Sequence, residues 1–232
     1  MIDITVLSSG SKGNCYHITD GETPLLLEAG IPWKKIQRGL DFRTSGIEGC
    51  LVTHQHKDHC KAAKDVMKAG IDICASNETI QVLGITGHRI NEVKARQQFN
   101  LGTWTILPFD TVHDVDSLGF LLANKVGEKL LYLTDTAYCK YKFVGLTHIM
   151  VESNFADDII RDNVEKGIVA PELKNRIIQS HFSLANVKEF FKANDLSKVE
   201  AIWLIHLSDD NSDSARFKLE IQRLTGKPVY IA

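Results

Sequence analysis

The densest group of chemically capable side chains lies in Thr53-His54-Gln55-His56-Lys57-Asp58-His59, where three imidazoles and one carboxylate fall within six residues. Imidazole nitrogens and carboxylate oxygens are ligands that zinc and similar divalent ions take in proteins. His54 and His56 are two residues apart and can face one ion, whereas Asp58 and His59 can reach a second. The segment therefore predicts a site for two metal ions.

Three further candidate ligands, His113, Asp135 and His206, each follow an apolar strand pattern. Polar side chains in such positions often build sites, because a rigid scaffold holds the loops that carry them. Two ions that share one carboxylate would leave a bridging water or hydroxide at the open position. The assignment is His54, His56 and His113 for one ion, Asp58, His59 and His206 for the other, and Asp135 as the bridge between them.

Strand and helix patterns that could position these ligands alternate along the chain. Strands are predicted over Ile2 to Leu7, Cys15 to Thr19, Thr23 to Glu28, Ile47 to Thr53, Ile71 to Ala75, Thr103 to Leu107, Leu118 to Asn124, Lys129 to Thr134, His148 to Glu152, Ala201 to His206 and Val229 to Ile231. Helices are predicted over Trp33 to Leu40, Cys60 to Ala69, a segment ending near Leu83, Leu184 to Ala193 and Ser214 to Leu224.

The order of these elements predicts an α/β protein. Strands come first and helices interleave in both halves, a pattern that two packed sheets with helices outside accommodate best. We therefore expect a four-layer αββα sandwich, with the polar segment Asn154 to Asn175 irregular. No linker or repeat divides the sequence, so we expect a single domain over residues 1–232.

The composition is that of a soluble globular protein, with 44% hydrophobic and 24% charged residues. A net charge of -2 gives no global attraction for nucleic acid or acidic membranes, so any nucleic-acid contact must be local. The five cysteines form no CxxC pair, which fits a reducing compartment, and Cys60 is expected to pack rather than bind metal. With no long apolar run and no signal peptide, we expect a cytoplasmic protein without membrane contact.

Taken together, the HxHxDH pattern and the later ligands resemble the metallo-β-lactamase superfamily over nearly the whole chain. Within it, the chain resembles the YycJ/WalJ-type metallo-hydrolases, regarded as DNA exonucleases and related to the tRNase Z branch. Shorter motifs carry this second resemblance: Ser8 to Asn14, Thr134 to Thr136, Val151 to Asn154, Leu173 to Ile177, Ser180 to Ser183, and His206 to Ser208 with Asn211. The family usually has Asp at Glu28, Gly at Ala137 and Ser180, and Leu at Phe182, so the resemblance is to a divergent member.

The resemblance implies a phosphodiesterase in which a metal-bridging hydroxide attacks phosphorus. Asp58 would bind a metal and orient that hydroxide or accept its proton. His181 would contact the scissile phosphate or protonate the leaving oxygen, and Glu152 would orient its ring. Alternatively, His181 caps the helix that starts near Leu184. The two ions would be zinc by ligand type, or manganese because two carboxylates take part.

A DNA exonuclease is therefore the leading hypothesis, with DNA favoured over RNA as the substrate. A tRNase Z-like endoribonuclease ranks second, because Asn154 to Asn175 is a short and polar candidate for its tRNA-binding arm. An acyl or thioester hydrolase on the same fold would need no pair of His181 and Glu152. The sequence assigns no strand polarity, duplex preference or oligomeric state.

Two further features could contact phosphates. The glycine- and serine-rich loop from Ser8 to Asn14 could present backbone N–H groups to a phosphate, or it could form an ordinary β-turn. Basic side chains could follow a nucleic-acid backbone or simply form a solvated surface, and they are Lys12, Lys140, Lys142, Lys174 and Arg176.

Overall fold

The computed structural model describes residues 1–232, which divide into two compact units. The N-terminal unit comprises Met1–Asp110 and Val115–Glu128, and the C-terminal unit comprises Thr111–Asp114 and Lys129–Ala232. The expectation of a single domain over the whole chain stays a prediction.

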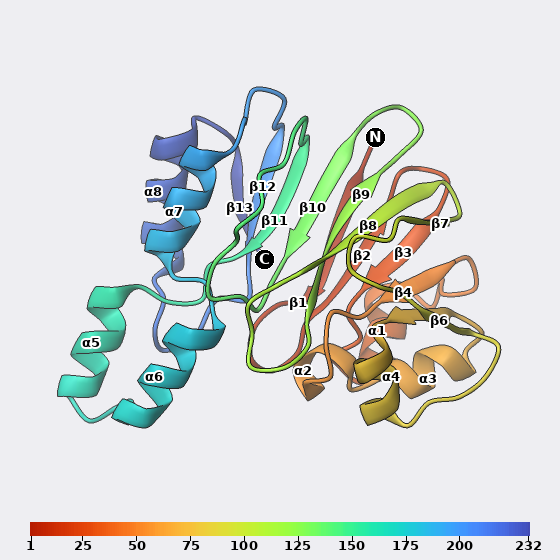
Figure 1. Cartoon of the computed structure of the whole chain (residues 1–232), viewed down its shortest axis with the longest axis horizontal. Helices are drawn as coiled ribbons and strands as arrows, with labels where there is room; N and C mark the ends of the chain where they lie inside the picture. Colours follow the sequence, from red (N-terminus) through yellow and green to blue (C-terminus); the bar gives the residue numbers. More distant parts are fainter. The chain divides into compact units, whose positions relative to one another are not determined.

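The N-terminal unit is built on a sheet in which β1 to β6 lie in chain order (Figure 1). Antiparallel pairing joins the first three strands, and parallel pairing joins β3 to β6. The strands are β1 (Asp3–Ser8), β2 (Cys15–Thr19), β3 (Pro24–Leu27), β4 (Gly49–Leu51), β5 (Asp72–Ala75) and β6 (Ile90–Glu92). The parallel register puts the residues that follow β3 and β4 at one edge, where the His-rich turn begins.

Helices α1 (Trp33–Gly39), α2 (Lys57–Cys60), α3 (Ala63–Lys68) and α4 (Asn77–Leu83) belong to the same unit. Ile36 of α1 and Val66 of α3 join Leu26, Cys50 and Ile73 of the sheet in one apolar core, and all five are 0% exposed. Complete burial of one large aliphatic side chain stabilises a fold by about 1.5–3 kcal/mol. This core holds the sheet edge that carries the His-rich turn.

An antiparallel group of three strands completes the N-terminal unit: β7 (Phe99–Leu101), β8 (Trp104–Asp110) and β9 (Leu118–Ala123). Trp104 is fully buried, and its indole Nε1 donates a 2.9 Å hydrogen bond to the carbonyl of Thr23. The backbone N–H of Leu118 donates to the carbonyl of Thr53 at 3.1 Å. The second bond fixes the residue that directly precedes His54.

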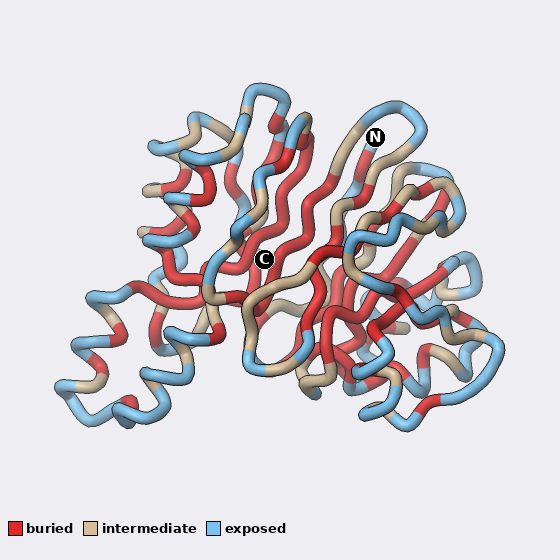
Figure 2. The backbone as a smooth tube through the Cα atoms, viewed as in Figure 1, coloured by how far each residue is buried: buried red, intermediate tan, exposed pale blue.

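The C-terminal unit contains four parallel strands: β10 (Lys129–Leu133), β11 (His148–Glu152), β12 (Ala201–Ile205) and β13 (Val229–Ile231). Helices α7 (Leu184–Ala193) and α8 (Ser214–Thr225) run beside these strands in Figure 1, and Figure 2 shows the strands as mostly buried. Ser183 and Asp213 cap the two helices. Parallel strands direct their carboxyl ends to one edge, so the residues after β10, β11 and β12 become neighbours.

Two predictions of secondary structure are wrong. The segment Asn154 to Asn175 is not irregular, because it contains α5 (Asp157–Glu165) and the first half of α6 (Pro171–Ser180). In α5, Ile160 is buried, and in α6, Pro171 occupies a favoured first-turn position. The outward residues of both helices are mostly polar and obscure the helical spacing of the apolar residues.

The helix expected over Cys60 to Ala69 is divided into α2 and α3. The division occurs because the N–H of Ala62 donates to the carbonyl of Ala29 at 2.7 Å instead of continuing the helix. Strands β6 and β7 were not predicted, since each has only three residues and none of them is buried. None of the helices has the length and apolar character needed to cross a membrane.

Candidate metal centre

In the N-terminal unit, the turn after β4 brings the histidine rings of the His-rich segment together. Nε2 of His54 lies 3.0 Å from Nδ1 of His56, and the ring centroids of His54 and His59 are 4.2 Å apart. Nδ1 of His54 contacts the Thr53 hydroxyl at 2.9 Å, which directs Nε2 toward His56. His54 and His59 are both fully buried. The grouping expected from the spacing is therefore present within this unit.

His59 lies between two carboxylates. Its Nδ1 is 3.4 Å from Oε1 of Glu28, and its Nε2 is 3.3 Å from Oδ2 of Asp58. Glu28 is fully buried, and its other oxygen accepts a 3.2 Å bond from the N–H of Thr53. A carboxylate behind a histidine fixes the ring and raises its basicity as a metal ligand. Glu28 can take this role although the related family usually has the shorter Asp.

Backbone contacts from the Ser8 to Asn14 loop hold Asp58 in place. The N–H of Asn14 donates to the carbonyl of Asp58 at 2.7 Å, and its side-chain Nδ2 reaches the same oxygen at 3.3 Å. A Cβ at Gly30 would lie 1.7 Å from that carbonyl, so only glycine fits there. Asn14 and Gly30 were not identified from the sequence as supports of Asp58. The only feature of the sequence that pointed to either residue is the Ser8 to Asn14 motif, which contains Asn14.

Cys60 packs in the helix and keeps its proton, as expected. Its Sγ donates to the carbonyls of Gln55 and His56, both at 3.1 Å. Burial, with a smaller contribution from the charge of Glu28, raises the pKa of the thiol to about 12. Because Sγ is directed at two backbone carbonyls of the turn, the donor set of this unit consists of imidazoles and carboxylate.

In the C-terminal unit, residues at the ends of parallel strands form a second group. Asp135 follows β10, Glu152 ends β11 and His206 follows β12. Oδ1 of Asp135 is 3.7 Å from Nε2 of His206, and Oε1 of Glu152 is 3.6 Å from Nδ1 of His206. Nδ2 of Asn154 contacts Nδ1 of the same ring at 3.1 Å and donates to the carbonyl of His206 at 2.9 Å. These contacts direct Nε2 of His206 toward Asp135.

His113 enters this unit from the loop after β8. Its Nδ1 is 2.9 Å from the carbonyl oxygen of Ser180, which can only accept a hydrogen bond, so the ring proton lies on Nδ1. Nε2 then presents a lone pair to carboxylate oxygens of Asp114 and Asp135, at 3.1 and 3.7 Å. A lone pair that faces two anionic oxygens is unfavourable unless a cation or an added proton lies among them.

His181 contacts Glu152 directly. Its Nδ1 lies 2.6 Å from Oε1 of Glu152, while Oε2 accepts bonds from the N–H groups of Phe182 and Thr136 at 3.0 and 3.2 Å. The side chain of His181 is 20% exposed, whereas Glu152 is fully buried. His181 does not cap the following helix, since the Ser183 hydroxyl accepts the bond from the N–H of Asn186 at 3.1 Å. The alternative role considered for His181 is therefore wrong.

The donor atoms of both groups suit divalent metal ions. In the C-terminal unit, one ligand atom from each of Asp135, Glu152, His181 and His206 lies within 4.8 Å of the others. In the N-terminal unit, Nε2 of His54 and Nδ1 of His56 face each other at 3.0 Å, with His54 fully buried and His56 half-buried, and a shared cation would satisfy one lone pair from each ring. The chemistry of both groups therefore fits metal binding.

The chain matches a family model described as the beta-lactamase superfamily domain over residues 31–207. Exodeoxyribonuclease WalJ of Streptococcus pneumoniae serotype 2 (strain D39 / NCTC 7466) is 26% identical to this chain. The alignment covers 90% of this chain and 82% of WalJ. Exodeoxyribonuclease YycJ of Bacillus anthracis is 24% identical, with 96% of this chain and 89% of the relative covered. The crystal structure of YhfI from Bacillus subtilis, a metallo-beta-lactamase fold protein, has a TM-score of 0.76 at 16% identity and covers 100% of this chain and 96% of that one.

The fold and the paired donor groups thus define a metal-dependent hydrolase with the α/β metallo-β-lactamase fold, as the αββα prediction expected. The chain belongs to the β-lactamase superfamily. Within it, the chain is similar over most of its length to the exonucleases WalJ and YycJ, so the resemblance inferred from the motifs is confirmed.

Proposed function

We propose that the protein is a dinuclear metal-dependent phosphodiesterase, and specifically an exonuclease that degrades DNA. The proposed ligands are those assigned from the sequence: His54, His56 and His113 for one ion, Asp58, His59 and His206 for the other, and Asp135 for both. Similarity to two relatives named exodeoxyribonucleases supports a nucleic-acid substrate and favours DNA over RNA.

The observation that carries this proposal is the 2.6 Å contact between His181 and Glu152. Because Nδ1 of His181 faces Glu152, Nε2 lies on the opposite side of the ring. There it can donate to a phosphate oxygen or pass a proton to the leaving oxygen of a phosphodiester. Glu152 is held by two backbone donors, so it fixes the orientation of the ring. A thioester or lactone hydrolase has no need for such a pair.

Two bound divalent ions would lower the pKa of a shared water and stabilise the negative charge on the phosphoryl oxygens. Asp58 is 27% exposed and contacts His59, so it can orient the attacking water and accept its proton. The many imidazoles favour zinc, and the carboxylates allow manganese. The five cysteines are free thiols, which supports a reducing, cytoplasmic location.

The test is degradation of end-labelled single- and double-stranded DNA and a tRNA precursor by protein loaded with Zn²⁺ or Mn²⁺. We expect stepwise shortening of DNA and its loss in Asp58→Ala. His181→Ala is expected to lower kcat by about 10²- to 10⁴-fold, as for a general acid. His88→Ala is the matched control, because His88 lies exposed in a loop of the N-terminal unit.

Each alternative has its own result. A single cut in the tRNA precursor with intact DNA would replace the exonuclease by a tRNase Z-like activity. Intact nucleic acids with hydrolysis of thioesters or lactones would contradict the phosphodiesterase proposal. Equal kcat in His181→Ala and His88→Ala would remove His181 from the reaction.

A further inference from the structure

Aromatic and basic side chains alternate in the loop that connects β10 to β11. Tyr138, Lys140, Tyr141, Lys142 and Phe143 lie within six residues, and the first of them is three residues beyond Asp135. Tyr138 is 51% exposed, both lysines are exposed, and Phe143 is buried. The loop therefore presents tyrosine and lysine outward while its final ring points into the protein.

Asn186 of α7 and Asn194, which directly follows α7, fix the ends of this loop. Nδ2 of Asn186 donates to the carbonyl of Ala137 at 2.8 Å, and Oδ1 of Asn194 accepts from the N–H of Phe143 at 2.7 Å. The five residues between these anchors run alongside α7. They are held in a defined position, which reduces the entropy lost when a ligand binds.

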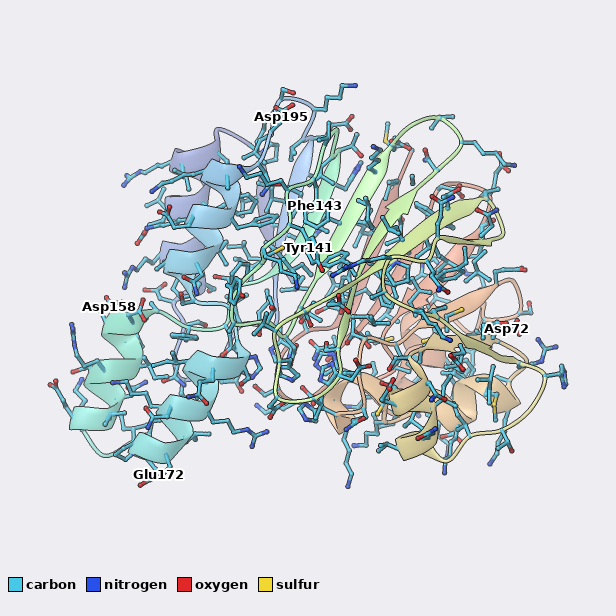
Figure 3. The ribbon with its side chains drawn as sticks, viewed as in Figure 1. Asp72, Tyr141, Phe143, Asp158, Glu172 and Asp195 are labelled. Carbon is cyan, nitrogen blue, oxygen red and sulfur yellow. The ribbon has the colours of Figure 1, made fainter.

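Tyr141 rests on a chain of aromatic rings. Its ring centroid is 6.5 Å from that of Phe143, which lies 6.3 Å from Phe190, and Phe190 lies 6.3 Å from Phe182. Figure 3 places Tyr141 and Phe143 close together in the loop. Nζ of Lys140 is 5.3 Å from the centroid of Tyr141. Tyr141 is thus a supported ring with a cation beside it.

A cavity of about 300 Å³ lies between the loop and α7. Tyr138, Lys140, Tyr141 and Lys142 line one side, and Phe182 contributes to the other. This volume is within the range of small-molecule pockets and suits one flat heterocycle. Phe182 directly follows His181, so the cavity adjoins the proposed reaction site along the chain. The one acidic lining residue, Glu189, forms an ion pair with Lys192 at 2.7 Å, which offsets its charge.

We infer that this loop binds single-stranded nucleic acid, with Tyr138 and Tyr141 stacking on bases and Lys140 and Lys142 contacting phosphates. Aromatic rings stack on any base, and interleaved cations follow the phosphate backbone, so the surface suits a strand of arbitrary sequence. The inference rests on the proposed function, because it names the surface that holds the strand beyond the scissile bond. The net charge of -2 gives no general attraction, which makes a local surface of this kind necessary.

The test is fluorescence anisotropy of a short, labelled phosphorothioate oligothymidylate with metal-loaded full-length protein. Tyr138→Ala/Tyr141→Ala is expected to raise Kd by at least about tenfold, and the corresponding double Phe variant to retain binding. Lys140→Ala/Lys142→Ala is expected to reduce the slope of log Kd against log salt by about 1.4. Tyr230→Ala is the matched control, since Tyr230 is 48% exposed, against 51% for Tyr138, and lies on β13 of the same unit.

The two proposals fail in different ways. If the wild-type protein neither binds nor degrades DNA, the proposed function fails and this inference with it. If the wild-type protein degrades DNA while the double Ala variant binds the oligonucleotide as tightly as Tyr230→Ala does, only the inference is overturned. Tyr138→Ala alone carries the same test if circular dichroism shows that the double Ala variant does not fold.

Discussion

Three residues at the candidate metal centre adopt left-handed backbone conformations that non-glycine residues rarely take. The φ angles are 65° at Glu28, 44° at Asp135 and 53° at His206. Such conformations cost about 1–3 kcal/mol each and persist only where the surrounding structure imposes them. Side-chain contacts impose them here, from Thr53 to Glu28 and from Asn154 to His206. Three of the six non-glycine residues with positive φ therefore lie where ligand direction matters.

Glu28 provides a prediction about a single residue. Glu28→Gln keeps the size of the side chain but removes the charge beside Nδ1 of His59, so His59 becomes a weaker ligand. We expect the metal Kd to rise by about 10- to 100-fold, as measured by competition with a chromophoric chelator. Glu48→Gln, at an exposed position in the same unit, is the matched control. An unchanged metal Kd in Glu28→Gln would mean that His59 does not ligate or needs no carboxylate behind it.

Ligand types and their spacing in the sequence were sufficient to locate the donor groups. The sequence alone identifies the candidate ligands, because metal binding depends on the type of side chain. These ligands are His54, His56, Asp58 and His59. The supports could not be predicted in the same way. The need for glycine at Gly30 arises from a backbone carbonyl that approaches only after folding. Ser180 was noted only as a replacement for the Gly usual in the family, yet its carbonyl oxygen is the group that fixes His113.

Among the helices, charged side chains connect α5 to α8 and α7. Oδ2 of Asp158 accepts from Arg216 at 2.6 Å, and Arg216 donates to Glu220 at 2.7 Å. Glu220 also accepts from Lys188 of α7. The hydrogen bond from Arg216 lowers the pKa of Asp158, and the bond from Lys188, followed by that from Arg216, lowers the pKa of Glu220. The network therefore stabilises the positions of these helices at neutral pH.

We predict that Asp158→Ala lowers the free energy of unfolding at pH 7 by about 0.2–1 kcal/mol, the range for exposed ion pairs. A carboxyl group with a lowered folded-state pKa stabilises the protein fully above its ordinary pKa of 3.8, and this contribution is lost as the pH falls further. Urea unfolding at several pH values should show the difference from wild type shrinking in acid.

Asp157→Ala is the matched control for this prediction, because both aspartates lie in the first turn of α5. It removes the same helix-terminal charge but no bond to Arg216. If both variants are destabilised equally at every pH, the effect belongs to the helix terminus and the network contributes nothing.

The elements with the strongest periodic patterns were predicted best. Helix α7 and strands β2 and β11 begin and end at the predicted residues. Helix α5 was missed because its apolar residues are few and its remaining surface is polar. The short strand β6 forms because β5 offers it hydrogen bonds. Pairing of this kind depends on the folded structure and leaves little pattern in the sequence.

At the scale of the whole molecule, metal binding and folding should be coupled. Asp135 and His206 lie far apart in the sequence, yet folding brings their ligand atoms to 3.7 Å. An unfolded chain offers no such arrangement, so a metal that binds these groups binds the folded chain preferentially. Without a cation, the buried carboxylate groups also lose hydration and face the lone pairs of the imidazoles. Both effects make the metal-free folded state less stable.

This coupling predicts a higher melting temperature for the metal-loaded protein than for the chelated protein. Free metal at 100 times its Kd adds about 2.7 kcal/mol to the free energy of unfolding. For a chain of this size, 1 kcal/mol corresponds to about 2–4 °C, so we expect a rise of about 5–11 °C in a thermal scan with Zn²⁺ or Mn²⁺ against one with chelator. The rise should be smaller in His206→Ala and unchanged in His88→Ala. Equal melting temperatures with metal and with chelator would contradict metal binding by the folded chain, whatever activity the protein has.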